Sequence, residues 1–113
     1  MNTKQHQNFA LEAADIAEKV LVNFEVENRK DARPRNAIKA ARDWANGKIK
    51  CGEARKLAFA AHAAAREAKS DAAIFAARAA AHAAATAHVE THLRAVKEYA
   101  KKSALSQENI TTK

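Results

Sequence analysis

The chain has 113 residues, a length that supports one modest hydrophobic core and therefore one domain. Hydrophobic residues make up 48% of the chain but aromatic residues only 5%, because much of the apolar content is alanine. Glycine occurs twice and proline once, and the abundant residues are strong helix formers. The composition therefore predicts an all-α fold without a sheet.

The net charge of +7 at pH 7 favours an acidic partner. The basic residues are scattered among 13 acidic ones, and no aromatic residues alternate with a basic tract to form a stacking platform for nucleic acid. We therefore expect a solvated basic surface, with nucleic-acid binding as the less favoured alternative.

The single cysteine, Cys51, cannot form an internal disulfide, which fits a reducing compartment. The first residues lack the apolar stretch of a signal peptide. No segment approaches the length of a membrane span without a charge or a histidine. These features predict a cytoplasmic protein with no membrane segment.

The first predicted helix spans about residues 5–24, where apolar side chains recur at helical spacing on one face. A polar connection, 25–33, follows it. Pro34 then suits the first turn of a second helix, and Gly47 is placed to end that helix. Trp44 lies at the margin of the buried stripe of this second helix.

A third helix is predicted over about 53–69, and Ser70 is a suitable N-cap for a fourth. Residues 71–103 contain neither glycine nor proline. They predict either one helix of roughly 33 residues, about 50 Å long, or a helix that kinks near Thr86 or Thr91.

The short link between the third and fourth helices predicts that they are antiparallel neighbours. Alanine surrounds most of the last helix over 72–87, so this segment should be buried on several sides. The simplest architecture is a four-helix antiparallel bundle over 1–105, with an alanine-rich helix pair and a long last helix. A homodimer is the alternative way to cover the alanine surface. Residues 106–113 are expected to form a disordered polar tail.

Polar side chains interrupt the apolar faces of the last two predicted helices. One stripe of the third helix and the core arc of the fourth carry arginine and histidine where the pattern calls for apolar residues. We therefore predict a polar seam inside the bundle. Its candidate binding residues are Arg55, His62, Arg66, Arg78 and His82, joined by His92.

His88 and His92 are four residues apart and are candidate metal ligands, as imidazole pairs on one helical turn are. No cysteine or carboxylate stands at a matching spacing, and the arginines would repel a cation. The favoured interpretation is structural: the polar residues satisfy helix ends and loop carbonyls, or pair with Glu53, Glu67 or Asp71.

The sequence predicts no enzyme and no cofactor. Cys51 lies at a helix start, where a thiolate is somewhat stabilised, but a lone cysteine in a short link is usually inert. No serine–histidine–acid set, phosphate-binding loop or pair of catalytic carboxylates is recognisable.

Several motifs stand in a distinctive order along the chain. They are Arg33-Pro34-Arg35, Trp44-Ala45-Asn46-Gly47, Glu53-Ala54-Arg55, the Ala-His-Ala run at 60–66, and the series that ends with His82, His88 and His92. Over about residues 6–100, this order resembles the Imm-5-like immunity proteins of bacteria. That family often has glycine where Ala81 stands here, a departure that favours a straighter helix and leaves a close backbone contact there in question.

The resemblance implies a non-catalytic protein that binds and neutralises a cognate bacterial toxin. Arg33, Arg35 and Trp44 are the candidate partner contacts if the Arg-Pro-Arg turn belongs to the binding surface. Many immunity proteins against nucleases are acidic mimics of nucleic acid, which a net charge of +7 excludes here. A non-nuclease toxin or an acidic partner surface is therefore favoured. The alternatives are a small-ligand or metal-binding helical bundle, a basic nucleic-acid-associated protein, and a self-associating structural bundle.

Overall fold

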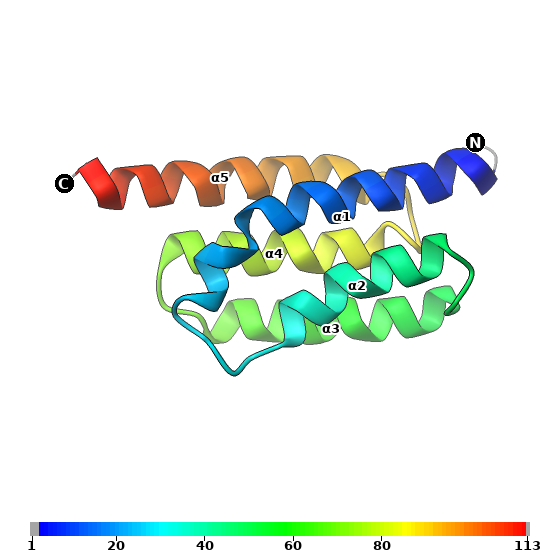
Figure 1. Ribbon diagram of the computed structural model, residues 1–113, viewed down its shortest axis with the longest axis horizontal. Helices are drawn as coiled ribbons and strands as arrows, with labels where there is room; N and C mark the ends of the chain where they lie inside the picture. Colours follow the sequence, from blue (N-terminus) through cyan, green and yellow to red (C-terminus); the bar gives the residue numbers. More distant parts are fainter. Residues whose placement is uncertain (1–2, 113) are drawn as a thin grey trace.

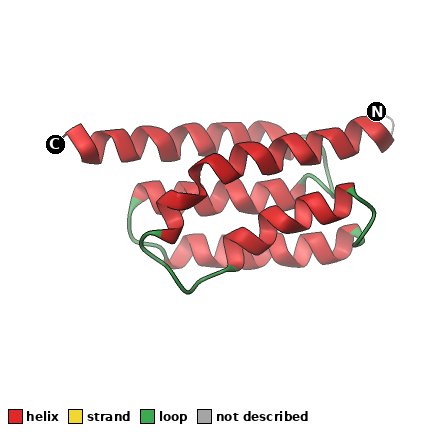
Figure 2. Ribbon diagram, viewed as in Figure 1, coloured by secondary structure: helices red, strands yellow, loops and turns green. Residues whose placement is uncertain are grey.

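The computed structural model describes the backbone of residues 3–112 and the side chains of residues 3–108, and over this range the chain forms five α-helices and no strand. The expected all-α class is confirmed, and every element is a helix in Figure 2. In chain order the helices are α1 (Thr3–Glu25), α2 (Arg33–Ala45), α3 (Cys51–Glu67), α4 (Asp71–Ala85) and α5 (His92–Thr112).

The expected four-helix bundle is wrong in one respect, because the predicted long last helix is divided into α4 and α5. The division begins at Thr86, which is fully buried. Its hydroxyl donates a hydrogen bond to the carbonyl of Ala83 (2.5 Å), and its own carbonyl accepts one from Nε2 of His6 on α1 (2.5 Å). The Thr86 carbonyl thus bonds to α1, and no following backbone N–H donates to it in the part of the chain that the structure describes. The chain turns, and α5 runs back along α4 (Figure 1).

α4 lies at the centre of the fold and contacts each of the other four helices. α3 and α5 flank it on opposite sides and, within the part of the chain that the structure describes, do not contact each other. α1 and α2 lie across one face of this α3–α4–α5 layer, as Figure 1 shows. α4 is therefore covered by helices on three sides.

Alanine makes this central position possible. Nine of the 15 residues of α4 are buried alanines, so the surrounding helices can approach its backbone closely. Each alanine buries little area, and the stabilisation comes from many short contacts rather than from bulky side chains. The surrounding helices contribute the larger buried groups, which include Phe24, Ile38 and Val96.

Three local signals place the helix boundaries where the sequence predicts them. Pro34 stands in the first turn of α2, and Gly47, just after α2, adopts a φ of +75°, which glycine tolerates best. The hydroxyl of Ser70 accepts a hydrogen bond from the backbone N–H of Ala73 (3.1 Å) and so caps α4.

The C-terminal segment expected to be a polar tail overlaps α5, which is helical as far as Thr112; Lys113 lies outside the described residues. The division of the chain into a domain and a tail therefore stays a prediction. Among the described residues, no helix combines the length and the apolar character needed to cross a membrane.

Candidate functional site

One side of α4 has no described helix packed against it. The half-buried side chains of α4 recur at helical spacing and therefore lie on this same side of the helix. Phe75, Arg78 and His82 lie along the middle of that side. α3 and α5 form the walls on either side. We call this surface the open face. It comprises Arg55, Phe59, His62 and Arg66 of α3, Phe75, Arg78 and His82 of α4, and His92, Tyr99 and Lys102 of α5.

Arg78 and His62 join α4 to α3 on the open face. Nη1 of Arg78 donates a hydrogen bond to Nδ1 of His62 over 2.6 Å. Because a guanidinium is permanently protonated, this bond requires that Nδ1 of His62 carries no proton, and the neutral ring holds its proton on Nε2. Burial, followed by the positive charges of Arg78 and Arg66, lowers the pKa of His62 to about 4. His62 is therefore neutral at pH 7.

His82 and His92 join α4 to α5 in the same region. Their Nδ1 atoms are 2.8 Å apart, so one ring donates and the other accepts. Burial, with a smaller contribution from His62, lowers the pKa of His82 to about 4, and burial also lowers the pKa of His92. The rings of His62 and His82 meet edge to face, with centroids 5.0 Å apart. Three neutral rings thus connect three helices.

Aromatic contacts continue this arrangement along α5. The ring of Tyr99 stacks on that of His82 at 5.4 Å and lies 6.1 Å from that of Phe75. The ammonium group of Lys102 lies 5.5 Å from the Tyr99 centroid and 5.7 Å from the Phe75 centroid, within cation–π range. Tyr99 and Lys102 were not predicted from the sequence. Their spacing from His92, seven and ten residues, is the signal that places them on its side of the helix.

The outer part of the open face is cationic. The guanidinium carbon of Arg55 lies 5.5 Å from the ring centroid of Phe59, and this ring is 59% exposed. Arg66 is also exposed. Among the described side chains, no carboxylate forms an ion pair with Arg55, Arg66 or Arg78. Their positive charges are therefore uncompensated within the described part of the chain.

The remaining predicted partner contacts lie on α2, away from the open face. Arg33 pairs with Asp31 (2.7 Å) and with Glu67 (2.9 Å), and Arg35 pairs with Glu25 (2.6 Å). Both arginines therefore have carboxylate partners within the chain. Trp44 is half-buried, and its ring centroid lies 4.5 Å from that of His6.

His88 and His92, the two candidate metal ligands, lie in different environments. His88 is exposed in the turn between α4 and α5, whereas His92 is hydrogen-bonded to His82. Within the described part of the chain, no group of three or more histidine, cysteine, aspartate or glutamate residues is arranged to hold a metal ion. Cys51 is a free, exposed thiol at the start of α3.

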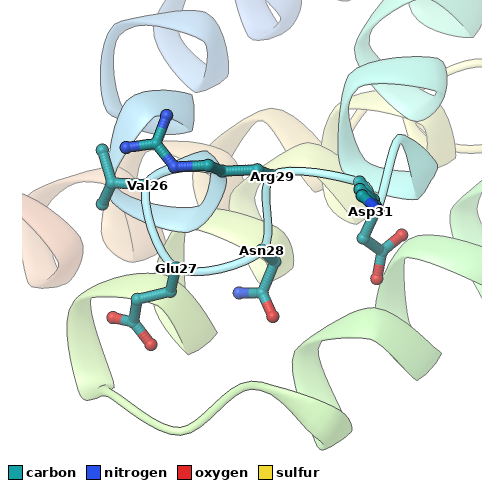
Figure 3. A pocket seen from close by; sticks show the side chains of 6 residues that line it. Val26, Glu27, Asn28, Arg29 and Asp31 are labelled. Atoms are coloured by element: carbon teal, nitrogen blue, oxygen red, sulfur yellow. The ribbon is translucent and has the colours of Figure 1, made fainter.

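An open depression lies at the loop between α1 and α2, over residues 26–31. Figure 3 shows that its side chains point in different directions instead of converging on one space. The side-chain amide of Asn28 donates a hydrogen bond to the carbonyl of Phe24, and the carboxylate of Asp31 accepts one from the guanidinium of Arg33. The carboxylate of Glu27 accepts a hydrogen bond from the Ser70 hydroxyl. These polar groups order the loop, so this depression is not the candidate site.

The fold and the open face together define a small helical protein with a preformed cationic surface. The chain matches the sequence model of the family described as "Imm-5 like putative immunity protein" over residues 1–112, and it belongs to that family. The resemblance seen in the sequence is thereby confirmed, and membership implies that the chain has a protein partner. Neither the curated proteins nor the solved structures gave a significant match.

Proposed function

We propose that this protein binds a cognate bacterial toxin and neutralises it without catalysing a reaction. The observation that carries this proposal is the family membership, which extends over residues 1–112. The open face supports it, because it spans three helices and its arginines form no ion pair with a carboxylate among the described side chains.

The construction of the open face suits tight binding. The hydrogen bond from Arg78 to His62 joins α4 to α3, and the one between His82 and His92 joins α4 to α5. A surface that is ordered before its partner arrives loses less conformational entropy on binding. Neutralisation then requires only that the protein occupies the toxin surface.

The same geometry argues against the alternative of a metal site. Nδ1 of His62 already accepts a hydrogen bond from Arg78, and the Nδ1 atoms of His82 and His92 are occupied by each other. The neighbouring Arg78 charge would repel a cation. Acid–base catalysis is also disfavoured, because a general acid or base works best with a pKa near the operating pH, and burial lowers the pKa values of His62 and His82 to about 4.

We also propose that the protein acts in the cytoplasm. An exposed, unpaired Cys51 is typical of a reducing compartment. Fractionation of cells that express the chain should recover it with cytoplasmic markers, and recovery with a periplasmic or secreted fraction would contradict this assignment.

The toxin-binding proposal is tested by co-expression. Each toxin encoded beside the gene is expressed in a sensitive bacterial strain with and without this protein. One of these toxins should lose its effect on growth and should copurify with the protein. If no neighbouring toxin is neutralised by a chain that circular dichroism shows to be folded and helical, the proposal fails.

The claim of a non-catalytic mechanism has its own test. Purified toxin is titrated with purified protein, and residual toxin activity is measured. Inhibition should be complete at a fixed molar ratio near equivalence and should be reversed when the two proteins are separated under denaturing conditions. Inactivation of a large molar excess of toxin would show turnover and would contradict the claim.

A further inference from the structure

We infer that the open face is the toxin-binding surface and that it recognises an acidic patch, whose carboxylates pair with Arg55 and Arg66 on either side of an apolar contact with Phe59. This inference rests on the proposed function and adds to it the surface used and the chemistry of the partner.

Ion pairs are distributed unequally between α2 and the open face. Each cation within α2 itself has a carboxylate partner among the described residues: Arg33 with Asp31, Arg35 with Glu25, and Lys39 with Asp43. Arg42, also on α2, pairs with two acids of α1, Asp15 and Glu18. The positive charge of α2 is therefore largely compensated by carboxylates.

The cations of the open face differ in this respect. Arg55 and Arg66 are exposed and Arg78 is half-buried, and none of them has an ion pair among the described side chains. The protein carries a net charge of +7, and this face holds part of the excess without compensation. Complementary charge attracts the correct partner and repels others, so a partner for this face should be acidic.

The residues of the open face that belong to α3 form a regular row. Arg55, Phe59, His62 and Arg66 follow one another at helical spacing and lie in one row. The two arginines are about 16 Å apart along the helix axis, calculated from the rise per residue. Phe59 lies between them and is 59% exposed. Aromatic residues and arginine are both enriched in protein–protein interfaces, so an exposed ring between two arginines favours a protein partner.

The exposed and the half-buried residues of the face have different roles. Arg55, Phe59 and Arg66 of α3 are exposed and make the contacts. His62, Arg78, His82 and His92 are half-buried, and their hydrogen bonds hold α3, α4 and α5 at fixed positions. Because His62 and His82 are neutral, the permanent charges of the arginines give the face its positive potential.

Two other occupants fit the face less well. A second copy of the chain, docked face to face, would bring arginines against arginines, and like charges at close range are costly. Nucleic acid is bound along a groove by closely spaced cations and by several stacking rings. Here the exposed arginines stand far apart, Phe59 is exposed between them, and Phe75 and Tyr99 are half-buried.

The test compares two charge reversals of equal size. R55E/R66E changes the open face, and R35E/K39E changes α2, and each lowers the net charge by the same amount. F59A removes the exposed ring alone. Circular dichroism and thermal unfolding first establish that each variant is folded. Affinity for the purified toxin that wild type neutralises is then measured by calorimetry at low and at moderate salt.

We expect R55E/R66E to weaken toxin binding at least 100-fold, F59A at least 10-fold, and R35E/K39E less than 3-fold. The affinity of wild type should fall with added salt, whereas the weakened affinity of R55E/R66E should depend on salt far less. If wild type binds the toxin and R55E/R66E binds it equally well, the inference fails although the proposed function stands.

If wild type binds no toxin, the proposed function fails and the inference fails with it. Two further results would then reassign the face. A gel shift of a single-stranded oligonucleotide that R55E/R66E abolishes would indicate nucleic acid. A dimer seen by light scattering in wild type and lost in R55E/R66E would indicate self-association. Either result would overturn the inference of an acidic protein partner.

Discussion

Arg78 of α4 donates a hydrogen bond to Nδ1 of His62 on α3 over 2.6 Å; this contact determines the tautomer of the histidine and, after burial, contributes to keeping it neutral. His82, one turn along α4 from Arg78, forms the corresponding contact with His92 of α5 over 2.8 Å. These two contacts join the three helices of the open face, α3, α4 and α5, through neutral histidine rings. The stability of the face should therefore depend on pH.

Acidification should destabilise the protein between pH 6.5 and 4 through His62 and His82. Their pKa in the folded protein is about 4, against an ordinary value of 6.5, so the unfolded chain binds protons first as the pH falls. The contribution of the neutral rings is complete above pH 6.5 and is lost as the pH falls toward 4. Since both rings are partly solvated and interact, we expect a combined loss of roughly 1–3 kcal/mol, measured by urea unfolding.

Other groups also titrate in this range, so the test is a difference between variants. In H62Q/H82Q the amide oxygen at position 62 can still accept the bond from Arg78, but neither side chain titrates. This variant should lose roughly 1–3 kcal/mol less than wild type between pH 7.5 and pH 4.5. Identical losses in the two proteins would show that the histidines do not contribute.

The alanine packing of α4 should tolerate no added volume. Ala80 is fully buried, so Ala80→Leu forces a larger side chain into a filled space and should lower the free energy of unfolding by about 1–3 kcal/mol. Ala104→Leu, at an exposed position of α5, is the matched control and should change it by less than about 0.5 kcal/mol. Equal stability of the two variants in urea unfolding would contradict close packing around α4.

The start of α4 should depend on the Ser70 hydroxyl. This group accepts the N–H of Ala73 (3.1 Å) and donates to Glu27 in the loop after α1. Ser70→Ala removes both bonds and should lower the free energy of unfolding by about 1 kcal/mol. Ser70→Thr retains a capping hydroxyl and should recover most of the loss. A Ser70→Ala protein as stable as wild type would show that the cap is unimportant.

His6 should stabilise the turn between α4 and α5. Its ring donates to the Thr86 carbonyl and lies against Trp44, which is the single tryptophan of the chain. His6→Ala should lower the free energy of unfolding by about 1–2 kcal/mol and should alter the native tryptophan fluorescence. His88→Ala, in the exposed part of the same turn, serves as the control and should do neither. Unchanged fluorescence in His6→Ala would argue against the contact.

The parts of the fold that depend on local signals could be predicted from the sequence. Helix propensity and apolar spacing predict the helices, while Pro34, Gly47 and Ser70 mark boundaries through their own backbone and side-chain chemistry. The break after Ala85 could not be predicted with the same certainty. It involves a bond from His6 to Thr86, residues 80 positions apart in the chain, and neither glycine nor proline marks it.

The candidate site was predicted in composition but not in geometry. On a continuous helix, His82 and His92 would be about 15 Å apart, so their contact requires the reversal of the chain between α4 and α5. The predicted interior seam is instead a half-buried face, because no described helix covers that side of α4. A continuous helix over 71–103 would also place its two halves end to end, and it therefore does not predict the stacking of Tyr99 of α5 on His82 of α4.

The central claim, that the toxin binds the open face, is tested most directly by titrating the isotope-labelled protein with unlabelled toxin and recording NMR chemical shifts. The largest changes should occur at Arg55, Phe59 and Arg66 of α3 and at Tyr99 and Lys102 of α5, while the amides of α2 (Arg33–Ala45) should remain nearly unchanged. Changes concentrated on α1 and α2, with the open face unaffected, would contradict the claim.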